Sequence, residues 1–254
     1  MALQVLKGKQ EIAPKVMITG LSGAGKSTLA STLPDALFLD IEGGLSFLDV
    51  ARIPIETADD LMQILVDLGS AAKNNKREYK YIVIDSVDWL VNLFVRKVTG
   101  SGQGQTLPAL MESATMTLNK AQGGYGNGKQ VLGNFVKDVF INFLTKLNRC
   151  GYGIVLIAHA EKKSLMDADG INIDRIAPKM DINSMNVLVE WVDNLFYIKR
   201  DDDGEHRLVV NPTDAIMAKN RIGISQDEFV VNDEFDLHKL ITGKAQVADK
   251  LTKD

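Results

Sequence analysis

The sequence has little cysteine, no long apolar run and no excess of basic residues. Its single cysteine, Cys150, excludes an internal disulfide and is typical of a reducing compartment. No stretch approaches the roughly 18 apolar residues of a membrane helix, and the first residues lack the apolar core of a signal peptide. The formal net charge of −4 gives no general attraction to nucleic acid, so such binding would need locally gathered basic side chains. We therefore expect a cytoplasmic protein with no membrane contact.

The length and the apolar content fit a globular chain with a substantial core. The chain has 254 residues, of which 45% are hydrophobic, as expected for one α/β domain with short extensions. We expect an N-terminal arm at residues 1–14, a core at residues 15–225, and a C-terminal helix and tail at residues 226–254. The tail is too short to be a domain of its own.

The most informative stretch is residues 20–27 (GLSGAGKS), which fits the phosphate-binding pattern G-x-x-x-x-G-K-[ST]. Residues 15–19 before it indicate a buried strand, and residues 27–33 a helix that ends before a proline. Glycines let backbone N–H groups turn toward phosphate oxygens, Lys26 can reach the β- and γ-phosphates, and Ser27 can ligate Mg²⁺. The pattern predicts ATP and Mg²⁺ as cofactors. The predicted nucleotide-binding residues are Gly20, Ser22, Gly23, Ala24, Gly25, Lys26, Ser27 and Thr28.

Three further apolar runs each lead to polar residues. They are residues 36–41 (ALFLDI), which lead to Asp40 and Glu42, residues 81–85 (YIVID), which end at Asp85, and residues 153–158 (GIVLIA), which lead to His159. Open α/β sheets bind ligands at the carboxyl ends of their strands. An apolar strand that ends in Asp downstream of a phosphate-binding loop is the Walker B pattern, whose Asp holds the water shell of Mg²⁺. We therefore predict Ser27 and Asp85 as the metal-binding pair and His159 as a sensor of the γ-phosphate.

Apolar periodicity predicts the remaining elements. Helical spacing indicates helices at residues 58–72, 86–98, 130–149, 183–190 and 233–241. Two alternating runs, residues 191–199 and 206–211, flank the turn signal DDDG and predict a β-hairpin. The order of these elements predicts an α/β fold with a mostly parallel central sheet flanked by helices and a late β-hairpin.

Two long polar segments interrupt this pattern. The first, residues 99–129, holds two glycine-rich pieces around a predicted helix at residues 107–121. Its second piece carries Tyr125 and Lys129, a ring and a cation that suit stacking on single-stranded nucleic acid, although an ordinary loop fits equally well. The second segment is residues 161–180. The side chains predicted to contact single-stranded DNA are Tyr125, Lys129, Lys162 and Lys163.

The order of these parts resembles the RecA-like ATPase core. Residues 37–45 (LFLDIEGGL) are similar to the RecA segment whose glutamate activates the attacking water, which implies that role for Glu42. Residues 84–87 (IDSV) resemble the Walker B segment of RecA. His159 stands where RecA has glutamine, so the chain departs from RecA itself.

The combination of GLSGAGKSTLA, LDIEGG, YIVIDS and VLIAHAEKK narrows the resemblance. It looks like the phage-encoded nucleotide-binding family that includes the core-only, Sak-type single-strand annealing ATPases, over about residues 15–225. This resemblance implies a DNA-stimulated ATPase that binds and anneals single-stranded DNA, often alongside a single-strand-binding protein.

Residues 219–223 (KNRIG) carry two cations, Lys219 and Arg221, at i and i+2, where an extended backbone points both to one side. They resemble an element of the RadA family and of DnaB-type helicases that reaches the γ-phosphate of a neighbour. The resemblance implies that both residues act catalytically across a subunit boundary in a homo-oligomer, either a ring or a filament. A hexameric helicase or branch-migration ATPase, and an ATP-driven switch without DNA, are the alternatives. A helicase usually carries a further domain, and a switch does not need two polar loops.

Overall fold

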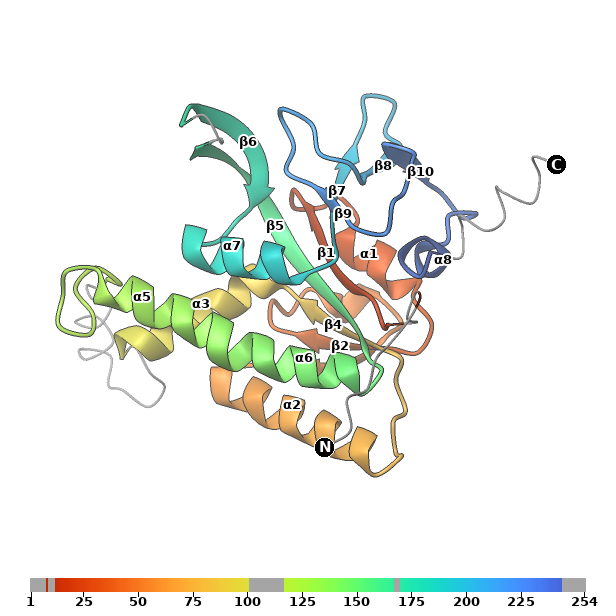
Figure 1. The fold of residues 1–254 in the computed structure, drawn as a ribbon. Helices are drawn as coiled ribbons and strands as arrows, with labels where there is room; N and C mark the ends of the chain where they lie inside the picture. The colour runs from red at the N-terminus through yellow and green to blue at the C-terminus, as the bar shows by residue number, and fades with distance from the viewer. Residues whose placement is uncertain (1–7, 9–11, 101–116, 167–169, 244–254) are drawn as a thin grey trace.

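The computed structural model describes residues 8, 12–100, 117–166 and 170–243, and they form one central sheet with helices against both faces (Figure 1). The strand order is β10-β8-β7-β1-β5-β4-β2-β3, with parallel pairing from β7 to β3 and antiparallel pairing at β8 and β10. The strands of this path are β1 (Lys15–Gly20), β2 (Ala36–Asp40), β3 (Ala51–Pro54), β4 (Tyr81–Asp85), β5 (Gly153–Met166), β7 (Asn194–Arg200), β8 (His206–Val209) and β10 (Glu228–Val231). Two strands lie off the path, β6 (Asn172–Pro178) beside β5 and β9 (Lys219–Asn220) beside β7.

Three of the described helices begin where a polar side chain satisfies their first N–H groups. Thr57 and Asp60 form a capping box at the start of one helix, and Asp181 and Asp236 cap two others. The helices are α1 (Lys26–Ser31), α2 (Ala58–Lys73), α3 (Val87–Thr99), α5 (Asn127–Asn134), α6 (Ile141–Arg149), α7 (Ile182–Trp191) and α8 (Leu237–Ile241). A short 3₁₀ turn, η1 (Leu45–Phe47), follows β2, and a wider π-helical turn, η2 (Phe135–Phe140), joins α5 to α6.

Alternation along the strands divides the core into two layers. Met17 on β1 faces the layer built with α2, α3, α5, α6 and α7, whereas Val16 and Ile18 face the layer built with α1 and α8. The same alternation holds on β4, where Ile82 and Val83 face opposite layers. Successive side chains of a strand point to opposite faces, so a sheet with helices on both sides needs continuous apolar strands. The predicted mostly parallel α/β sheet and the late β7–β8 hairpin are confirmed.

The polar segment at residues 161–180 is not a loop, which corrects the sequence-based prediction. β5 continues to Met166 and pairs antiparallel with β6, and the resulting hairpin extends beyond the rest of the sheet (Figure 1). Lys162 and Ser164 are exposed while Lys163 and Leu165 are partly buried, which is the period of a strand. The charged side chains concealed this alternation because they occur on both faces.

The C-terminal residues contribute to the same sheet and core. β10 pairs with β8, and Leu237, Leu240 and Ile241 of α8 are buried in the layer that contains α1. The hydroxyl of Tyr81 lies 2.7 Å from Nδ1 of His238, which ties α8 to β4. The predicted boundary after residue 225 therefore falls inside one continuous sheet.

Residues 107–116 of the predicted helix, most of the N-terminal arm and residues 244–254 lie outside the described residues. Residues 118–121, the end of the predicted helix, form turns instead. Within the described ranges, no helix is long and apolar enough to cross a membrane.

Candidate nucleotide site

The carboxyl ends of β1, β2 and β4 meet at one edge of the sheet, beside the point where β5 leaves its parallel neighbours at His159. Gly20 at the end of β1 lies opposite His159 on β5, and Asp40 at the end of β2 lies opposite Asp85 on β4. Because β4 also pairs with β5, the four strands are immediate neighbours. The structure therefore brings together the phosphate-binding loop, both acidic strand ends and His159.

The loop after β1 surrounds the Lys26 ammonium. Lys26 Nζ donates hydrogen bonds to the carbonyl oxygens of Gly20 at 3.2 Å and Leu21 at 2.9 Å. Burial lowers the pKa of Lys26, while the nearby carboxylates, first that of Asp85, act in the opposite direction. An ammonium held by carbonyls of its own loop can exchange them for phosphate oxygens with a small movement.

Two glycines of this loop are required by its surroundings. A Cβ at Gly20 would lie 2.6 Å from the carbonyl oxygen of Ile198 on β7, so any other residue would push the strands apart. Gly25 has a φ of +88°, and a Cβ there would lie 3.2 Å from the ring of His206. Nδ1 of His206 is also 3.0 Å from the carbonyl oxygen of Ala24. The sequence analysis missed His206, because the alternation of a strand does not reveal what its first residue contacts.

The remaining loop residues leave a backbone surface that suits a polyphosphate. Ser22, Gly23 and Thr28 are exposed, whereas Ala24 is 6% exposed and anchors the loop in the core. Gly23 has a φ of +75°, and no atom of the described residues lies within 4 Å of the position that its Cβ would take. The loop therefore presents backbone rather than side chains, as phosphate binding requires.

A hydroxyl and a carboxylate meet where the loop faces β4. Ser27 Oγ donates a 2.6 Å hydrogen bond to Oδ2 of Asp85. Burial raises the pKa of Asp85 to about 6, while the hydrogen bond from Ser27 acts in the opposite direction. Such an oxygen pair fits Mg²⁺, which takes one or two protein carboxylates together with phosphate oxygens and water. The described residues contain no cluster of three or more His, Cys, Asp or Glu side chains suited to a metal, so the phosphates would have to complete the coordination.

The two acids after β2 have different surroundings. Asp40 is 5% exposed, and its Oδ1 accepts a 2.7 Å hydrogen bond from the N–H of Gly43 while its Oδ2 lies 3.5 Å from Nη1 of Arg52. Asp40 therefore shapes the turn that follows the strand. Glu42 is more exposed, and its Oε1 lies 3.7 Å from Nε2 of His159. Of the two acids, Glu42 is the one whose carboxylate can reach a bound nucleotide.

His159 is held from its other side by Asp88, in the first turn of α3. The backbone N–H of His159 donates to Oδ1 of Asp88 at 3.0 Å, and Nδ1 of its ring lies 3.0 Å from Oδ2 of the same carboxylate. Asp88 is 5% exposed. The sequence analysis missed it, because an acid in the first turn of a helix is common and needs no other reason than the helix dipole.

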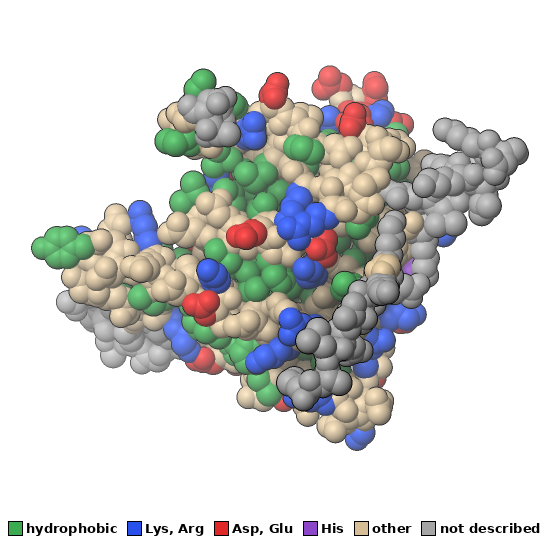
Figure 2. Space-filling view, viewed as in Figure 1, with side chains coloured by type: hydrophobic (Ala, Val, Ile, Leu, Met, Phe, Trp, Pro, Cys, Tyr) green, Lys and Arg blue, Asp and Glu red, His purple; other side chains and the backbone are tan. Residues whose placement is uncertain are grey.

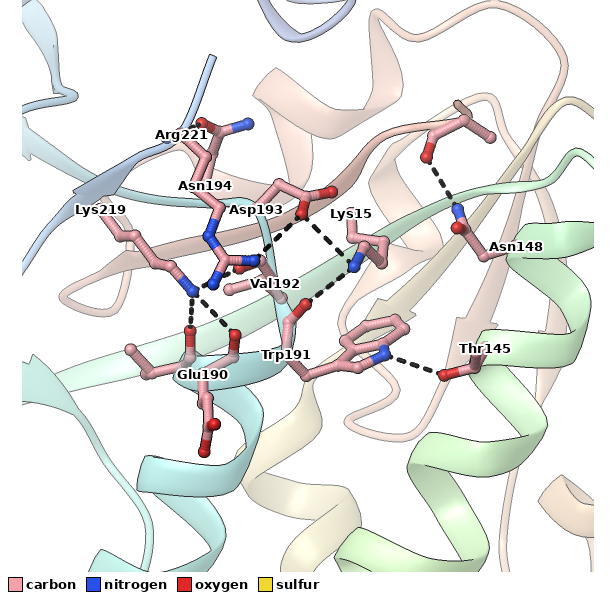
Figure 3. Close-up of polar contacts among 12 residues, drawn as sticks. Lys15, Thr145, Asn148, Glu190, Trp191, Val192, Asp193, Asn194, Lys219 and Arg221 are labelled. Atoms are coloured by element: carbon pink, nitrogen blue, oxygen red, sulfur yellow. Dashed lines mark hydrogen bonds and ion pairs between the residues drawn. The ribbon is translucent and has the colours of Figure 1, made fainter. Parts of the chain in front are cut away.

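Lys219 and Arg221 lie at the opposite edge of the sheet, where β1 and β7 begin (Figure 3). Lys219 Nζ donates to the carbonyl oxygens of Val189, Glu190 and Val192, at 2.6 to 2.8 Å, and so caps the carboxyl end of α7. Burial lowers the pKa of Lys219, and the charge of Arg221 acts in the same direction.

Arg221 remains accessible at this edge. Its side chain is 57% exposed, with Nη1 3.7 Å from Oδ1 of Asp193, which also binds Lys15 (Figure 3). β1 separates this edge from the phosphate-binding loop of the same chain by about 17 Å, at roughly 3.3 Å per residue. Neither cation can therefore reach the nucleotide of its own subunit.

The predicted DNA-binding residues fall in two places. Tyr125 is fully exposed in the turn before α5, and Lys129 lies in the first turn of that helix. Lys162 and Lys163 lie on β5 in the hairpin, where Lys162 forms a 2.9 Å ion pair with Asp174. Lys163 is partly buried and binds Glu161 and the carbonyl oxygen of Met180. The hairpin lysines are thus already paired within the chain.

The parallel sheet, the phosphate-binding loop and the Ser27–Asp85 pair define a P-loop nucleotide hydrolase. The profile of the family described as AAA domain matches residues 12–222. The chain therefore belongs to the AAA domain family, whose members are ATPases. The predicted P-loop ATPase class is confirmed by this match. No curated protein matches the chain.

Proposed function

We propose that the protein is an ATP-dependent, single-stranded-DNA-binding ATPase of the recombinase or annealing type, which hydrolyses ATP between the subunits of a homo-oligomer. The observation that carries the proposal is the placement of Glu42 beside His159, on the same edge as Lys26 and the Ser27–Asp85 pair. An accessible carboxylate at that edge is what hydrolysis needs in addition to nucleotide binding.

Each residue of the edge has a defined task in this proposal. Lys26 would bind the β- and γ-phosphate oxygens, and Ser27 and Asp85 would hold Mg²⁺, which would neutralise charge on the phosphates. Glu42 orients and deprotonates the attacking water. Phosphoryl transfer depends mainly on positioning and electrostatics, so a rigid sheet edge is a suitable platform.

A polar cleft beside Tyr125 supports the DNA-binding part. The cleft has a volume of about 460 Å³ and lies between α5 with η2 on one side and α7 on the other. Its lining has two lysines, four side-chain amides and no acid, namely Lys129, Lys137, Gln130, Asn134, Asn183 and Asn186, beside Gly126, Gly133 and Val187. Lysines suit phosphate oxygens, and amides suit the edges of bases.

The exposed ring of Tyr125 adds a reason to favour single strands. Duplex bases are stacked on each other, whereas the bases of a single strand can stack on an aromatic side chain. On the face shown in Figure 2, Lys and Arg side chains are dispersed among acidic and apolar ones. The chain as a whole has a net charge of −4. Binding should therefore depend on a few local contacts and weaken with salt.

The position of Arg221 supports the proposal that hydrolysis takes place between subunits. The described contacts of Lys26 and Glu42 include no arginine, and Arg52 at the same edge is paired with Asp40. Arg221 is exposed at the opposite edge. The proposal requires a ring or filament in which this opposite edge of one subunit faces the nucleotide of the next. An arginine supplied in this way stabilises charge in the transition state.

The test is the ATPase rate of the full chain without polymer, with single-stranded DNA, with duplex DNA and with RNA. Stimulation by single-stranded DNA above the other polymers supports the proposal. Equal stimulation by duplex DNA would favour a helicase or branch-migration ATPase. An unchanged rate with every polymer would favour a switch that does not use DNA.

A pair of double variants locates the DNA. Lys129→Ala with Lys137→Ala should weaken binding to single-stranded DNA and reduce the salt dependence, by a slope of about 0.7 for each lost phosphate contact. The matched control is Lys73→Ala with Lys76→Ala, two exposed lysines at the end of α2. Equal effects of the two double variants would place the DNA away from the cleft. A single-strand-binding protein can then be titrated against the complex as a further partner.

A further inference from the structure

We infer that Asp88 is a positioning residue for ATP hydrolysis: it holds His159 in one tautomer, with Nε2 facing Glu42, so that Glu42 and His159 together orient the attacking water. The inference rests on the proposed ATPase site and adds a residue to it. Asp88 lies on α3, outside every phosphate-binding pattern of the sequence.

Asp88 contacts both the backbone and the ring of His159. One carboxylate oxygen accepts the backbone N–H of His159 and the other faces ring Nδ1, each at 3.0 Å. An ionised carboxylate can only accept hydrogen bonds, so Nδ1 must carry the proton. The backbone contact fixes the strand and the ring contact fixes the side chain, so the imidazole cannot rotate without losing a charge-assisted bond.

These contacts with Asp88 determine whether Nε2 of His159 presents a lone pair or a proton to Glu42. With the proton on Nδ1, the neutral ring presents a lone pair at Nε2, 3.7 Å from Oε1 of Glu42. That distance is too long for a direct hydrogen bond, and a water that donates to both groups needs them about 4.5 Å apart. The exposed Glu42 side chain therefore has to turn slightly away from the ring to admit the water. Two acceptors can bind both hydrogens of one water molecule, which turns its lone pairs away from them and toward the phosphate edge. The opposite tautomer would place N–H at Nε2, which can draw the Glu42 carboxylate into a direct hydrogen bond and so occupy it.

Asp88→Asn tests the tautomer directly. The asparagine oxygen can still accept the backbone N–H of His159, while its NH₂ group donates to ring Nδ1 and moves the ring proton to Nε2. The chain has three histidines, so the imidazole ¹⁵N spectrum can be assigned by comparison with His159→Gln. We expect the Nδ1–H form of His159 in the parent protein and the Nε2–H form in Asp88→Asn, both without nucleotide.

The kinetic result should follow the spectrum. We expect Asp88→Asn to lower kcat by about 10- to 100-fold, the scale of a lost orienting contact, with little change in KM for ATP. In the His159→Gln background the same substitution should cause no further loss, because the ring that it orients is gone. The control is Asp35→Asn, which makes the same chemical change at an ion pair with Lys80 and should alter neither the spectrum nor kcat.

Two results would overturn the inference: an Nε2–H tautomer of His159 in the parent protein, or an Asp88→Asn protein with the parent tautomer and the parent kcat. If Asp88→Asn fails to fold, the parent spectrum alone decides whether Asp88 holds Nδ1–H. If the parent protein hydrolyses no ATP, the proposed function fails, whereas the tautomer measurement still tests the grip of Asp88.

Discussion

Two lysines at opposite edges of the sheet have similar local bonds and different surroundings. Lys26 and Lys219 both donate to backbone carbonyl oxygens, and burial lowers the pKa of both. Lys26, however, is bound by an exposed glycine-rich loop and has carboxylates as its charged neighbours. Lys219 is bound by the end of a helix, and its strongest charged neighbour is the cation Arg221.

The comparison shows that a buried lysine ammonium can bind a ligand when the backbone carbonyl oxygens around it can be replaced. The loop around Lys26 exposes backbone at Gly23, so phosphate oxygens can replace its carbonyls. The carbonyls around Lys219 end α7 and would lose their partner. The catalytic cation of the second edge is therefore Arg221 in our proposal, and Lys219 holds the segment from which it projects.

The largest effect is expected when one variant loses the catalytic residue of the first edge and another variant loses that of the second edge. Arg221→Ala and Glu42→Gln should each abolish most hydrolysis, because an arginine supplied in trans contributes about 10³- to 10⁵-fold and a general base about 10²- to 10⁴-fold. A mixture of the two proteins can form sites with an intact Glu42 from one subunit and an intact Arg221 from the other. Such a mixture should recover part of the ATPase rate, measured at several mixing ratios.

The mixing experiment needs proof of co-assembly. Mixed oligomers can be detected with two affinity tags, one on each variant. If co-assembled mixtures recover no activity, Arg221 does not work across the subunit boundary.

A smaller effect is expected from Lys26→Ala, which removes a cation from the nucleotide edge alone. A lost charge-assisted contact costs about 1.5–3 kcal/mol, or roughly 10- to 150-fold in affinity. Calorimetric titration with ATP and Mg²⁺ measures this change. ATP binding and hydrolysis at parental levels would mean that the loop after β1 is not the phosphate site.

Replacement of the two lysines should lower the free energy of unfolding by different amounts. Lys219→Met removes the cap of α7 and should lower the free energy of unfolding by about 1 kcal/mol, since the cost of burying the charge offsets part of the lost contacts. Lys26→Met should lower it less, because Lys26 binds two carbonyl oxygens where Lys219 binds three, and the substitution also removes a buried charge. Urea unfolding without nucleotide compares the two variants, and a more destabilising Lys26→Met would contradict the assignment.

The sequence predicted the parts of the site that depend on local patterns. The spacing of glycines and Lys26, and the acids that follow apolar strands, required only that the strands be parallel neighbours. Asp88 and His206 could not be predicted in the same way. Each contacts a residue more than 70 positions away in the chain, His159 and Ala24 respectively, and no periodicity encodes such contacts.

The hairpin shows a second limit of sequence patterns. Its strands carry charged side chains on both faces, so β5 appeared to end near His159 although it continues to Met166. Ion pairs such as Lys162 with Asp174 satisfy these charges across the hairpin. Leu165, Ile176 and Ala177 of the hairpin also pack against the core, but their charged neighbours in the sequence conceal the alternation.

The smallest effect concerns the protonation of Asp85. Burial raises its pKa to about 6, and Mg²⁺ must compete with the proton for this carboxylate. Lowering the pH from 7 to 6 should therefore weaken Mg²⁺-dependent nucleotide binding by about twofold through this group.

The unfolded chain has an ordinary, lower Asp pKa, so between about pH 4 and 6 the folded protein binds more protons at this site. Its contribution to stability must then rise as the pH falls, opposite to the trend in binding. Asp85→Asn should remove both trends, and Ser27→Ala should move the binding midpoint to higher pH, because the hydrogen bond from Ser27 lowers the pKa. Parallel pH titrations of binding and of urea unfolding on these proteins measure the two trends, and trends of the same sign would show that Asp85 is not the titrating group.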